Sequence, residues 1–240
     1  MTTYQTRLRS REEVADRTMA FHLQKPAGFQ FKPGQYIDLA LINPSETDSQ
    51  GVVRTFSIAS APYEDELLVA TRMRDSAFKR VLAAFPPGTE LKLDGPMGSF
   101  TLHRNTAKAA VFLAGGIGIT PFLSIVRQAA KEKLPHQLYL FYSNRRPEDA
   151  PFLAGLQDLS QSNPHFIFIP SMTEMERSKR NWLGERGFID REMLVKHFSD
   201  LNGPIYYVAG PPAMVAAMQQ MLAKAGVSED DIRTEEFSGY

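Results

Sequence analysis

The stretch AAVFLAGGIGITPF, Ala109–Phe122, passes from an unbroken apolar run into a cluster of glycines and then into Thr-Pro. Such a run is typical of a β-strand that is buried on both faces. Glycines at the carboxyl end of a strand permit positive φ and let backbone N–H groups approach a phosphate closely. We expect Thr120 to cap the next helix and Pro121 to occupy its first turn. A tight turn that only packs helix against strand would give the same pattern.

The segments that follow continue to alternate between strand and helix patterns. Apolar strand-like runs are HQLYLFYSN (His136–Asn144), HFIFIPSM (His165–Met172) and PIYYVAG (Pro204–Gly210). Among the helix-like segments, Asp190 is the expected N-cap of REMLVKHF, and Gly226 is the expected end of the last helix. A second glycine loop, AGPPAM (Ala209–Met214), also joins a strand to a helix. This alternation predicts an α/β, Rossmann-like nucleotide domain with a parallel sheet over residues 104–240.

Residues 1–103 have a different pattern of short strands separated by Pro and Gly. These strands are expected at Met19–Pro26, Gly34–Ile42, Val52–Ser60, Glu66–Arg74 and Thr89–Pro96. One helix interrupts them after Ser76, its expected N-cap, with Phe78, Val81 and Leu82 on a shared face. The spacing predicts an antiparallel β-barrel, which is joined to the second domain near Leu102–Lys108.

The composition narrows the classes of function. Basic and acidic residues are equal in number, 27 of each, which argues against nucleic acid as the partner. The chain has no cysteine, so thiolate metal sites and cysteine-ligated iron–sulfur clusters are excluded, and its five histidines show no metal-ligand spacing. No stretch reaches the roughly 18 apolar residues of a membrane helix. We therefore expect a cytoplasmic protein without a membrane span and without a metal site.

The stretch RTFSIAS, Arg54–Ser60, adds a third motif in the barrel half. Alternation places Arg54 and Phe56 on one face of a strand, and Thr55 and Ser57 on the other. An arginine beside an aromatic ring can bind a phosphate while the ring packs on a flat ligand. A cross-strand salt bridge and a core phenylalanine would explain the same residues.

Taken in order, these motifs resemble those of the ferredoxin–NADP reductase superfamily. RTFS is similar to its Arg-x-Tyr/Phe-Ser flavin motif, and FKPGQY and GPMGSF are similar to segments on either side of it. GGIGITP resembles its nicotinamide–pyrophosphate loop, AGPPAMV its second nucleotide loop, and EEFSGY the ending of several stand-alone members. The likeness extends from Phe31 to Tyr240, without the iron–sulfur domain that some members carry.

The resemblance implies a role for each group of motif residues. The flavin contacts would come from Arg54, Thr55, Phe56 and Ser57. Ser57 would be the catalytic residue, with a hydrogen bond near the flavin N5. The FAD pyrophosphate would be held by the segment that contains Thr71, Arg72, Met73 and Ser76, which favours FAD and leaves FMN possible. The dinucleotide would lie on Gly115, Gly116, Gly118 and Thr120, with its nicotinamide side over Gly210, Pro211 and Pro212.

The donor coenzyme, NADPH or NADH, stays open at this point. Ser143, Arg145 and Arg146 follow the second strand of the sheet and could hold a 2′-phosphate. Asp149 could instead accept the ribose hydroxyl of NADH and repel that phosphate, and exposed arginines at a strand end are common. A terminal aromatic, Tyr240 or Phe237, could cover the flavin or could belong to a frayed tail.

The implied activity is that of a flavin-dependent oxidoreductase. It would take hydride from NAD(P)H onto bound FAD and pass electrons to a separate acceptor such as ferredoxin, flavodoxin or an oxygenase component. Two alternatives stay open: a reductase of free flavin or another small molecule, and a non-catalytic electron-transfer subunit of a larger complex. The intact GGIGITP loop argues against the non-catalytic subunit, because a chain that binds no nucleotide has no need of it.

Overall fold

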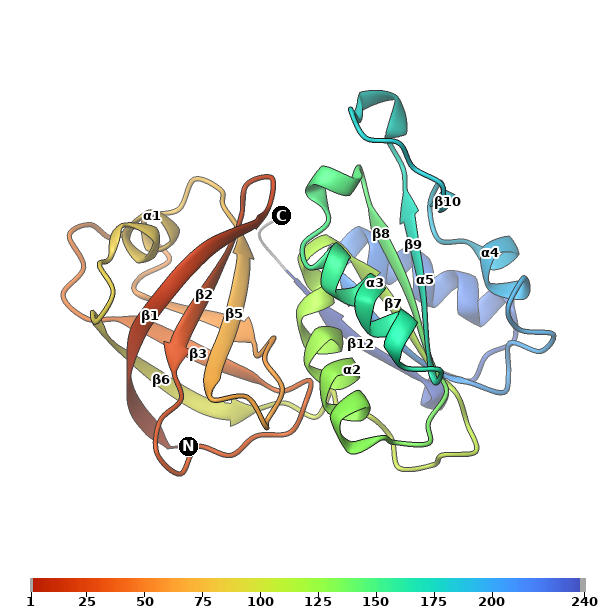
Figure 1. The fold of residues 1–240 in the computed structure, drawn as a ribbon, viewed down its shortest axis with the longest axis horizontal. Helices are drawn as coiled ribbons and strands as arrows, with labels where there is room; N and C mark the ends of the chain where they lie inside the picture. Colours follow the sequence, from red (N-terminus) through yellow and green to blue (C-terminus); the bar gives the residue numbers. More distant parts are fainter. Residues whose placement is uncertain (1, 238–240) are drawn as a thin grey trace.

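The computed structural model describes residues 2–237, and within them the strands form two six-stranded sheets (Figure 1). The first sheet contains β1 (Thr3–Ala15), β2 (Thr18–Gln24), β3 (Tyr36–Leu41), β4 (Val53–Ser57), β5 (Glu66–Arg72) and β6 (Glu90–Met97). Their order is β4-β3-β6-β1-β2-β5, and each neighbouring pair is antiparallel. The sheet curls until its two edges approach, where the Ala59 amide donates to the Leu68 carbonyl at 2.8 Å. The predicted antiparallel barrel is confirmed.

The barrel interior is filled by alternate strand residues and by one face of α1 (Ala77–Ala84). A period of two directs Ile37 and Leu39 of β3 inward, and both are fully buried. On α1, Phe78 and Leu82 belong to the same buried cluster. This is the helix face that the sequence spacing predicted, so the apolar stripe of α1 holds the helix against the barrel.

The second sheet is parallel throughout. Its strands are β7 (Ala110–Gly115), β8 (Leu138–Asn144), β9 (Phe166–Met172), β10 (Glu185–Arg186), β11 (Ile205–Gly210) and β12 (Ile232–Glu236). The α-helices are α2 (Thr120–Glu132), α3 (Leu153–Ser162), α4 (Arg191–Val195) and α5 (Pro212–Lys224). Short 3-10 turns lie between them: η1 (Gly116–Ile119), η2 (Pro147–Asp149), η3 (Met175–Arg177) and η4 (Glu229–Asp231). The predicted α/β domain with a parallel sheet is confirmed.

The strand order β10-β9-β8-β7-β11-β12 reverses at β7. Every residue of β7 and of β11 is buried, as expected of strands that are covered on both faces. The apolar residues of α2 and α3 pack on one face of the sheet, and those of α4 and α5 pack on the other (Figure 1). In open α/β sheets, ligands bind beyond the carboxyl ends of the strands at such a reversal. Both glycine loops therefore begin at the topological switch point.

The two sheets are joined through α2, which packs against the barrel as well as against its own sheet (Figure 1). One apolar cluster contains Ala59 from the barrel half together with Phe122 of α2. At the same junction the Ser124 hydroxyl donates to the Ser60 carbonyl at 2.6 Å. The domain boundary predicted between residues 103 and 104 lies between β6 and β7 and stays a prediction.

Two predicted helix ends are confirmed. Asp190 accepts a hydrogen bond from the Met193 amide at 2.8 Å and so caps α4. Gly226 has φ +87° just after α5, a left-handed conformation that glycine adopts without strain. Both signals are local in sequence, and the structure uses them as expected.

The predicted N-cap at Thr120 is wrong, whereas Ser76 is the N-cap residue of α1 as predicted. The Thr120 hydroxyl donates to the Ile117 carbonyl and does not cap α2, because η1 already provides a helical turn ahead of it. Ser76 stands at the N-cap of α1, but its side chain makes no capping bond. Instead, the Asp48 carboxylate accepts a hydrogen bond from the Ala77 amide at 3.0 Å. A carboxylate from a distant loop has thus replaced the local cap.

Candidate functional site

A cleft opens where the loops after β7 and β11 meet. It has a volume of about 560 Å³ and is bordered by Gly115 and Gly116 from the first loop, and by Pro211 and Met214 from the second. Other segments complete the wall: Arg72, Ser143, Asn144, Arg145, Thr173, Phe188, Ile189, Ala213, Ala217 and Met218. A cleft of this volume lies within the range of small-molecule sites, roughly 300–1,000 Å³.

Residues of the first glycine loop differ in their surroundings. Gly115 and Gly116 border the cleft, and Gly116 has φ +52°, in the left-handed region. Gly118 permits close packing, because a Cβ there would lie 2.3 Å from the Ala209 carbonyl oxygen. Within the described residues, Gly118 and Thr120 lie behind the cleft wall, so their predicted contact with a dinucleotide would be indirect.

In the second loop, Gly210–Pro212, each of the three residues has a different position. Pro211 borders the cleft. Gly210 lies behind it, where a Cβ would be 3.2 Å from the Gly115 amide nitrogen. Pro212 is the first residue of α5, a position at which proline loses no helical hydrogen bond. The two loops therefore depend on each other for their shape.

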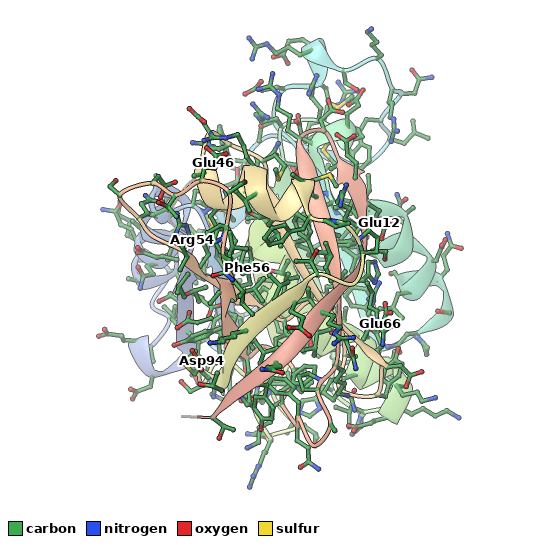
Figure 2. All side chains as sticks on the ribbon, turned by 90° about the vertical axis from the view of Figure 1, so that its left-hand side faces the viewer. Glu12, Glu46, Arg54, Phe56, Glu66 and Asp94 are labelled. Atoms are coloured by element: carbon green, nitrogen blue, oxygen red, sulfur yellow. The ribbon has the colours of Figure 1, made fainter. Side chains whose placement is uncertain are left out.

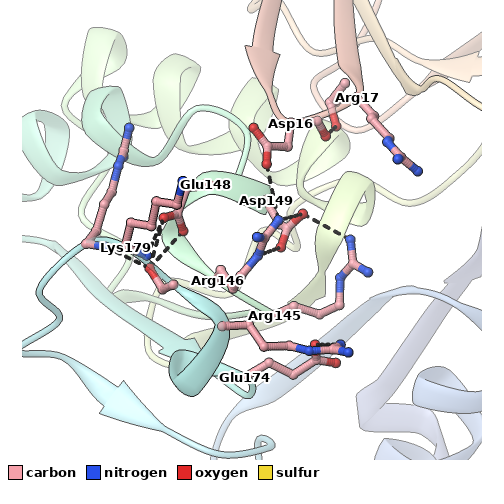
Figure 3. A network of polar contacts seen from close by, with 12 residues as sticks. Asp16, Arg17, Arg145, Arg146, Glu148, Asp149, Glu174 and Lys179 are labelled. Atoms are coloured by element: carbon pink, nitrogen blue, oxygen red, sulfur yellow. Dashed lines mark hydrogen bonds and ion pairs between the residues drawn. The ribbon is translucent and has the colours of Figure 1, made fainter.

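Two residues that follow β8, Arg145 and Arg146, contact the same carboxylate, that of Asp149 (Figure 3). Ser143 and Arg145 border the cleft, and the Arg145 side chain is 54% exposed. Arg145 also lines a charged cavity on the barrel side, together with Arg146, Asp149 and Asp16, which do not border the cleft. Arg146 Nε lies 2.7 Å from Asp149 Oδ2, and Arg146 Nη2 lies 3.1 Å from Asp16 Oδ2. The structure therefore brings only part of the predicted 2′-phosphate set to the cleft.

Asp149 is the centre of an ion-pair network that joins the two sheets (Figure 3). Its side chain is 2% exposed and also contacts Arg145 at 3.0 Å and Arg72 of β5 at 3.6 Å. Burial by itself raises the Asp149 pKa, but the hydrogen bond from Arg146 and the charges of the three arginines hold the pKa below its ordinary value. Asp149 is therefore an ionised carboxylate whose contacts are internal to the network.

A smaller cavity, of about 110 Å³, lies on the barrel side of the cleft. Its lining comes from β4, β5 and three other segments: Arg54, Thr55, Phe56, Ser57, Ala70, Thr71, Arg72, Lys79, Ile117 and Phe237. Arg72 borders this cavity and the cleft alike. Ile117 follows directly on Gly116 of the cleft wall, so the two cavities adjoin at the first glycine loop.

The donors around the small cavity suit a ligand that carries a phosphate. Arg54, Arg72 and Lys79 supply positive charge. The Ser76 hydroxyl, at the start of α1, is buried and has no hydrogen-bond partner among the described residues. A buried unpaired hydroxyl is uncommon in folded proteins, and Ser76 itself does not border the cavity. The volume of about 110 Å³ is below the roughly 300 Å³ of small ligand sites, so a ligand as large as a flavin would fit only after lining groups move.

Two further residues of the predicted site, Met73 and Phe237, make backbone hydrogen bonds to other segments of the chain. The Met73 backbone amide donates to the Arg17 carbonyl at 2.6 Å, which ties β5 to the β1–β2 turn. The Phe237 ring borders the small cavity, and the Phe237 amide donates to the Gly210 carbonyl at 3.0 Å. Tyr240 lies outside the described residues.

Glu235 is a candidate functional residue that the sequence patterns did not identify. β12 pairs with β11 so that Glu235 lies opposite Ala209, beside the second glycine loop. There the Ser57 hydroxyl donates to Glu235 Oε2 at 3.4 Å. Burial raises the pKa of Glu235 to about 7, against a smaller lowering by the Ser57 hydrogen bond. A carboxyl group that titrates near neutral pH beside Ser57 can hold or release a proton at this site.

Glu235→Gln should stabilise the protein at alkaline pH and change little at acid pH. Because the pKa of Glu235 is 4.5 in the unfolded chain and about 7 in the folded protein, the unfolded chain loses this proton at a lower pH than the folded protein does. Wild-type stability therefore declines as the pH rises from the unfolded pKa to the folded one, by up to about 3 kcal/mol at about 1.4 kcal/mol per pH unit. Thermal melts of both proteins at about pH 4.5 and about pH 8.5 test this. A difference in Tm between the two proteins that is the same at both pH values would contradict this prediction.

The fold and the two cavities define a class of protein. The barrel carries the Arg-x-Phe-Ser motif on β4, and the parallel sheet carries two glycine loops at its switch point. This is the two-domain fold of ferredoxin–NADP reductase-type proteins. Residues 112–220 match the family model of the oxidoreductase NAD-binding domain.

Two curated relatives illustrate the likeness in sequence. The chain is 29% identical over 219 residues to the reductase component of propane 2-monooxygenase from Rhodococcus jostii (strain RHA1), which covers 89% of this chain and 57% of that protein. It is 29% identical over 225 residues to the glycine betaine monooxygenase reductase subunit of Chromohalobacter salexigens, covering 92% of this chain and 60% of that protein. The chain therefore spans about three-fifths of the length of these relatives.

The likeness in structure extends over the whole chain. A ferredoxin NADP+ reductase from Neisseria gonorrhoeae, solved with bound FAD and NADP, has a TM-score of 0.81 at 23% identity and covers 98% of both chains. Together with the family-model match, this confirms the predicted resemblance to the ferredoxin–NADP reductase superfamily.

Proposed function

We propose that the protein is an NAD(P)H-dependent flavoprotein oxidoreductase that passes electrons to a separate acceptor. The observation that carries the proposal is that the two cavities adjoin, with Arg72 bordering both of them. Bound FAD would supply the redox chemistry, by accepting hydride from the coenzyme and giving electrons to the acceptor. The two relatives described above are reductase components of monooxygenases, which supports an oxygenase component as the acceptor. FMN stays the alternative cofactor.

In this proposal, the groups of the chain bind, orient and exclude water. Arg54 and the Ser76 hydroxyl are the donors for a flavin phosphate, and Phe56 supplies an apolar surface beside them. The Ser57 hydroxyl and the Glu235 carboxyl form a hydrogen-bonded pair that can hold a proton beside the small cavity, which Ser57 borders. Because glycine has no side chain, the first glycine loop leaves room for the coenzyme ring to approach the small cavity closely.

Flavin binding and reduction test the proposed function. Purified protein, reconstituted with FAD or FMN, should be yellow, and its flavin absorbance should bleach anaerobically when NADPH or NADH is added. Release and mass spectrometry of the bound flavin would separate FAD from FMN. Protein that stays colourless after reconstitution and oxidises neither coenzyme would overturn the proposal. Multiple turnovers of added free flavin, without retained flavin, would support the free-flavin reductase instead.

For the donor coenzyme, we propose NADPH in preference to NADH. Ser143 and Arg145 border the cleft, and among the described residues of its wall there is no Asp or Glu. Asp149, the group that would accept a ribose hydroxyl and repel a 2′-phosphate, is 2% exposed and engaged by three arginines. A cationic and hydroxyl-bearing wall favours the added phosphate of NADPH.

Arg145→Ala should weaken NADPH binding about tenfold and leave NADH binding nearly unchanged, because a hydrogen bond to a charged group is worth about 1.5 kcal/mol or more. Titration of the protein with 2′,5′-ADP and with 5′-ADP, by calorimetry, measures the preference without catalysis. Arg146→Ala is the matched control, because Arg146 also pairs with Asp149 but does not border the cleft, so its loss should leave the ratio of the two affinities unchanged. Equal affinity of the wild type for the two nucleotides would contradict NADPH preference.

The compartment and the domain boundary belong to the same proposal. No helix within residues 2–237 is long and apolar enough to cross a membrane. We propose a cytoplasmic location, where reduced nicotinamide coenzyme is available, and a flavin domain over residues 1–103 followed by a coenzyme domain over residues 104–240. Limited proteolysis that cleaves first near residues 102–108 would support this boundary, and cleavage first within either domain would argue against it.

A further inference from the structure

The guanidinium of Arg54 is enclosed by the loop that precedes β4. Arg54 Nη1 donates to the carbonyls of Gln50, Gly51 and Val53 at distances between 2.7 and 3.1 Å. Arg54 Nη2 lies 3.2 Å from Asp48 Oδ1, and the Arg54 side chain is only 18% exposed. The arginine assigned above to a flavin phosphate therefore has both of its terminal nitrogens engaged by groups of its own chain.

Asp48 bridges Arg54 and the start of α1. Its Oδ2 accepts the Ala77 amide in the first turn of α1 at 3.0 Å, and its Oδ1 accepts the Gln50 amide at 3.0 Å. Helix N-termini attract anions because their amide N–H groups are unpaired and the helix dipole is positive there. One carboxylate thus links Arg54 to the start of α1, while the Ser76 hydroxyl beside it stays unpaired among the described residues.

These contacts keep Asp48 charged at neutral pH. Burial raises the Asp48 pKa, but the amides of Ala77 and Gln50 and the Arg54 guanidinium together bring it below its ordinary value. A carboxylate and a phosphate within a few ångströms repel each other, so Arg54 and the α1 N-terminus cannot serve both anions at once.

We propose that Asp48 is an internal competitor for the flavin phosphate: its carboxylate holds Arg54 and the N-terminus of α1 until a flavin phosphate displaces it. The inference rests on the proposed function. Asp48 therefore lowers the affinity for phosphate-bearing flavins by the cost of this exchange.

Glu46 provides a matched control from the same loop. It pairs with Arg80, whose Nε and Nη2 lie 2.9 and 2.8 Å from the two Glu46 carboxylate oxygens. Figure 2 shows Glu46 beside α1 and apart from Arg54. Glu46→Gln removes one negative charge from this loop and leaves the contacts of Arg54 in place. Asp48→Asn removes a charge as well, but keeps an oxygen that can accept the Ala77 amide.

The test compares three apoproteins, the wild type, Asp48→Asn and Glu46→Gln, in titrations with FAD, FMN and riboflavin followed by quenching of flavin fluorescence. Riboflavin carries the ring without a phosphate. Asp48→Asn should bind FAD and FMN at least about fivefold more tightly than the wild type, because the phosphate no longer has to displace a carboxylate from Arg54 and from the Ala77 amide. Its affinity for riboflavin should not change, and Glu46→Gln should match the wild type throughout. Thermal melts of the apoproteins verify that both variants fold.

Each contrary result has a defined meaning. Unchanged or weaker FAD binding by Asp48→Asn overturns the inference, and weaker binding would make Asp48 a positioning residue for Arg54. Equal tightening by Glu46→Gln, or tighter riboflavin binding by Asp48→Asn, overturns it as well, because net charge or a wider cavity would then be the cause. If none of the three proteins binds any flavin, the proposed function fails and the inference fails with it; flavin binding by the wild type separates the two failures.

Discussion

Gly118→Ala should lower the free energy of unfolding by about 3 kcal/mol or more, which corresponds to a fall in Tm of about 6–12 °C. The added Cβ would lie 2.3 Å from the Ala209 carbonyl oxygen, 2.5 Å from its carbon and 2.7 Å from the Gly210 nitrogen. All three atoms are backbone and belong to β11, which is buried over its whole length, so no side chain can move aside. The two glycine loops would have to separate, and binding of 2′,5′-ADP should weaken together with stability. Thermal melts and nucleotide titration measure both effects.

Gly155→Ala is the matched control for Gly118→Ala. Gly155 lies on the exposed face of α3, and a Cβ there would meet nothing within 4 Å. Alanine in a helix is favoured over glycine by roughly 0.5–1 kcal/mol, so this variant should melt slightly above the wild type. A Gly118→Ala protein that melts within a degree or two of the wild type and binds 2′,5′-ADP normally would refute the packing argument.

Much of the fold could be predicted because its central strands carry local signals. β7 and β11 are apolar from end to end, since both of their faces are covered. β1 gave no such signal: most of its side chains are exposed, and Thr6 and Leu8 are its two buried residues. β12, with the sequence IRTEE, was missed for a similar reason, because it has no fully buried residue. These two polar strands are held by pairing with strands whose own pattern is clear.

The candidate site was only partly predictable, because several of its contacts join residues that are far apart in sequence. The glycine loops could be located from composition alone. Ser57 and Glu235, in contrast, are separated by 178 residues, and their contact depends on the register of β12 beside β11. Asp48 similarly replaces the expected Ser76 cap from a distant loop. The sequence shows which residues can bind, whereas the tertiary structure decides which of them already have partners.

Asp149→Asn should destabilise the protein by about 3 kcal/mol, because it leaves three arginines at the domain junction without their shared counter-charge. The Asp149 side chain is 2% exposed, and its partners come from both halves of the chain: Arg72 from the barrel, and Arg145 and Arg146 from the parallel sheet. Without the carboxylate, the like charges repel and the two halves lose an ionic contact. Urea unfolding at neutral pH measures the loss. Glu174→Gln is the control, since its partner Arg177 is 69% exposed and such surface pairs contribute less than about 1 kcal/mol.

The pH dependence of the same variant separates a charge effect from a packing effect. The folded-state pKa of Asp149 is lowered from 3.8, so its stabilisation is fully present above the unfolded pKa and disappears as the pH falls through the folded pKa. The difference in unfolding free energy between wild type and Asp149→Asn should therefore be constant from neutral pH down to about pH 5, and should shrink below about pH 4. A difference that persists unchanged at lower pH would show that shape and hydrogen bonding at Asp149, and not its charge, hold the two halves of the chain together.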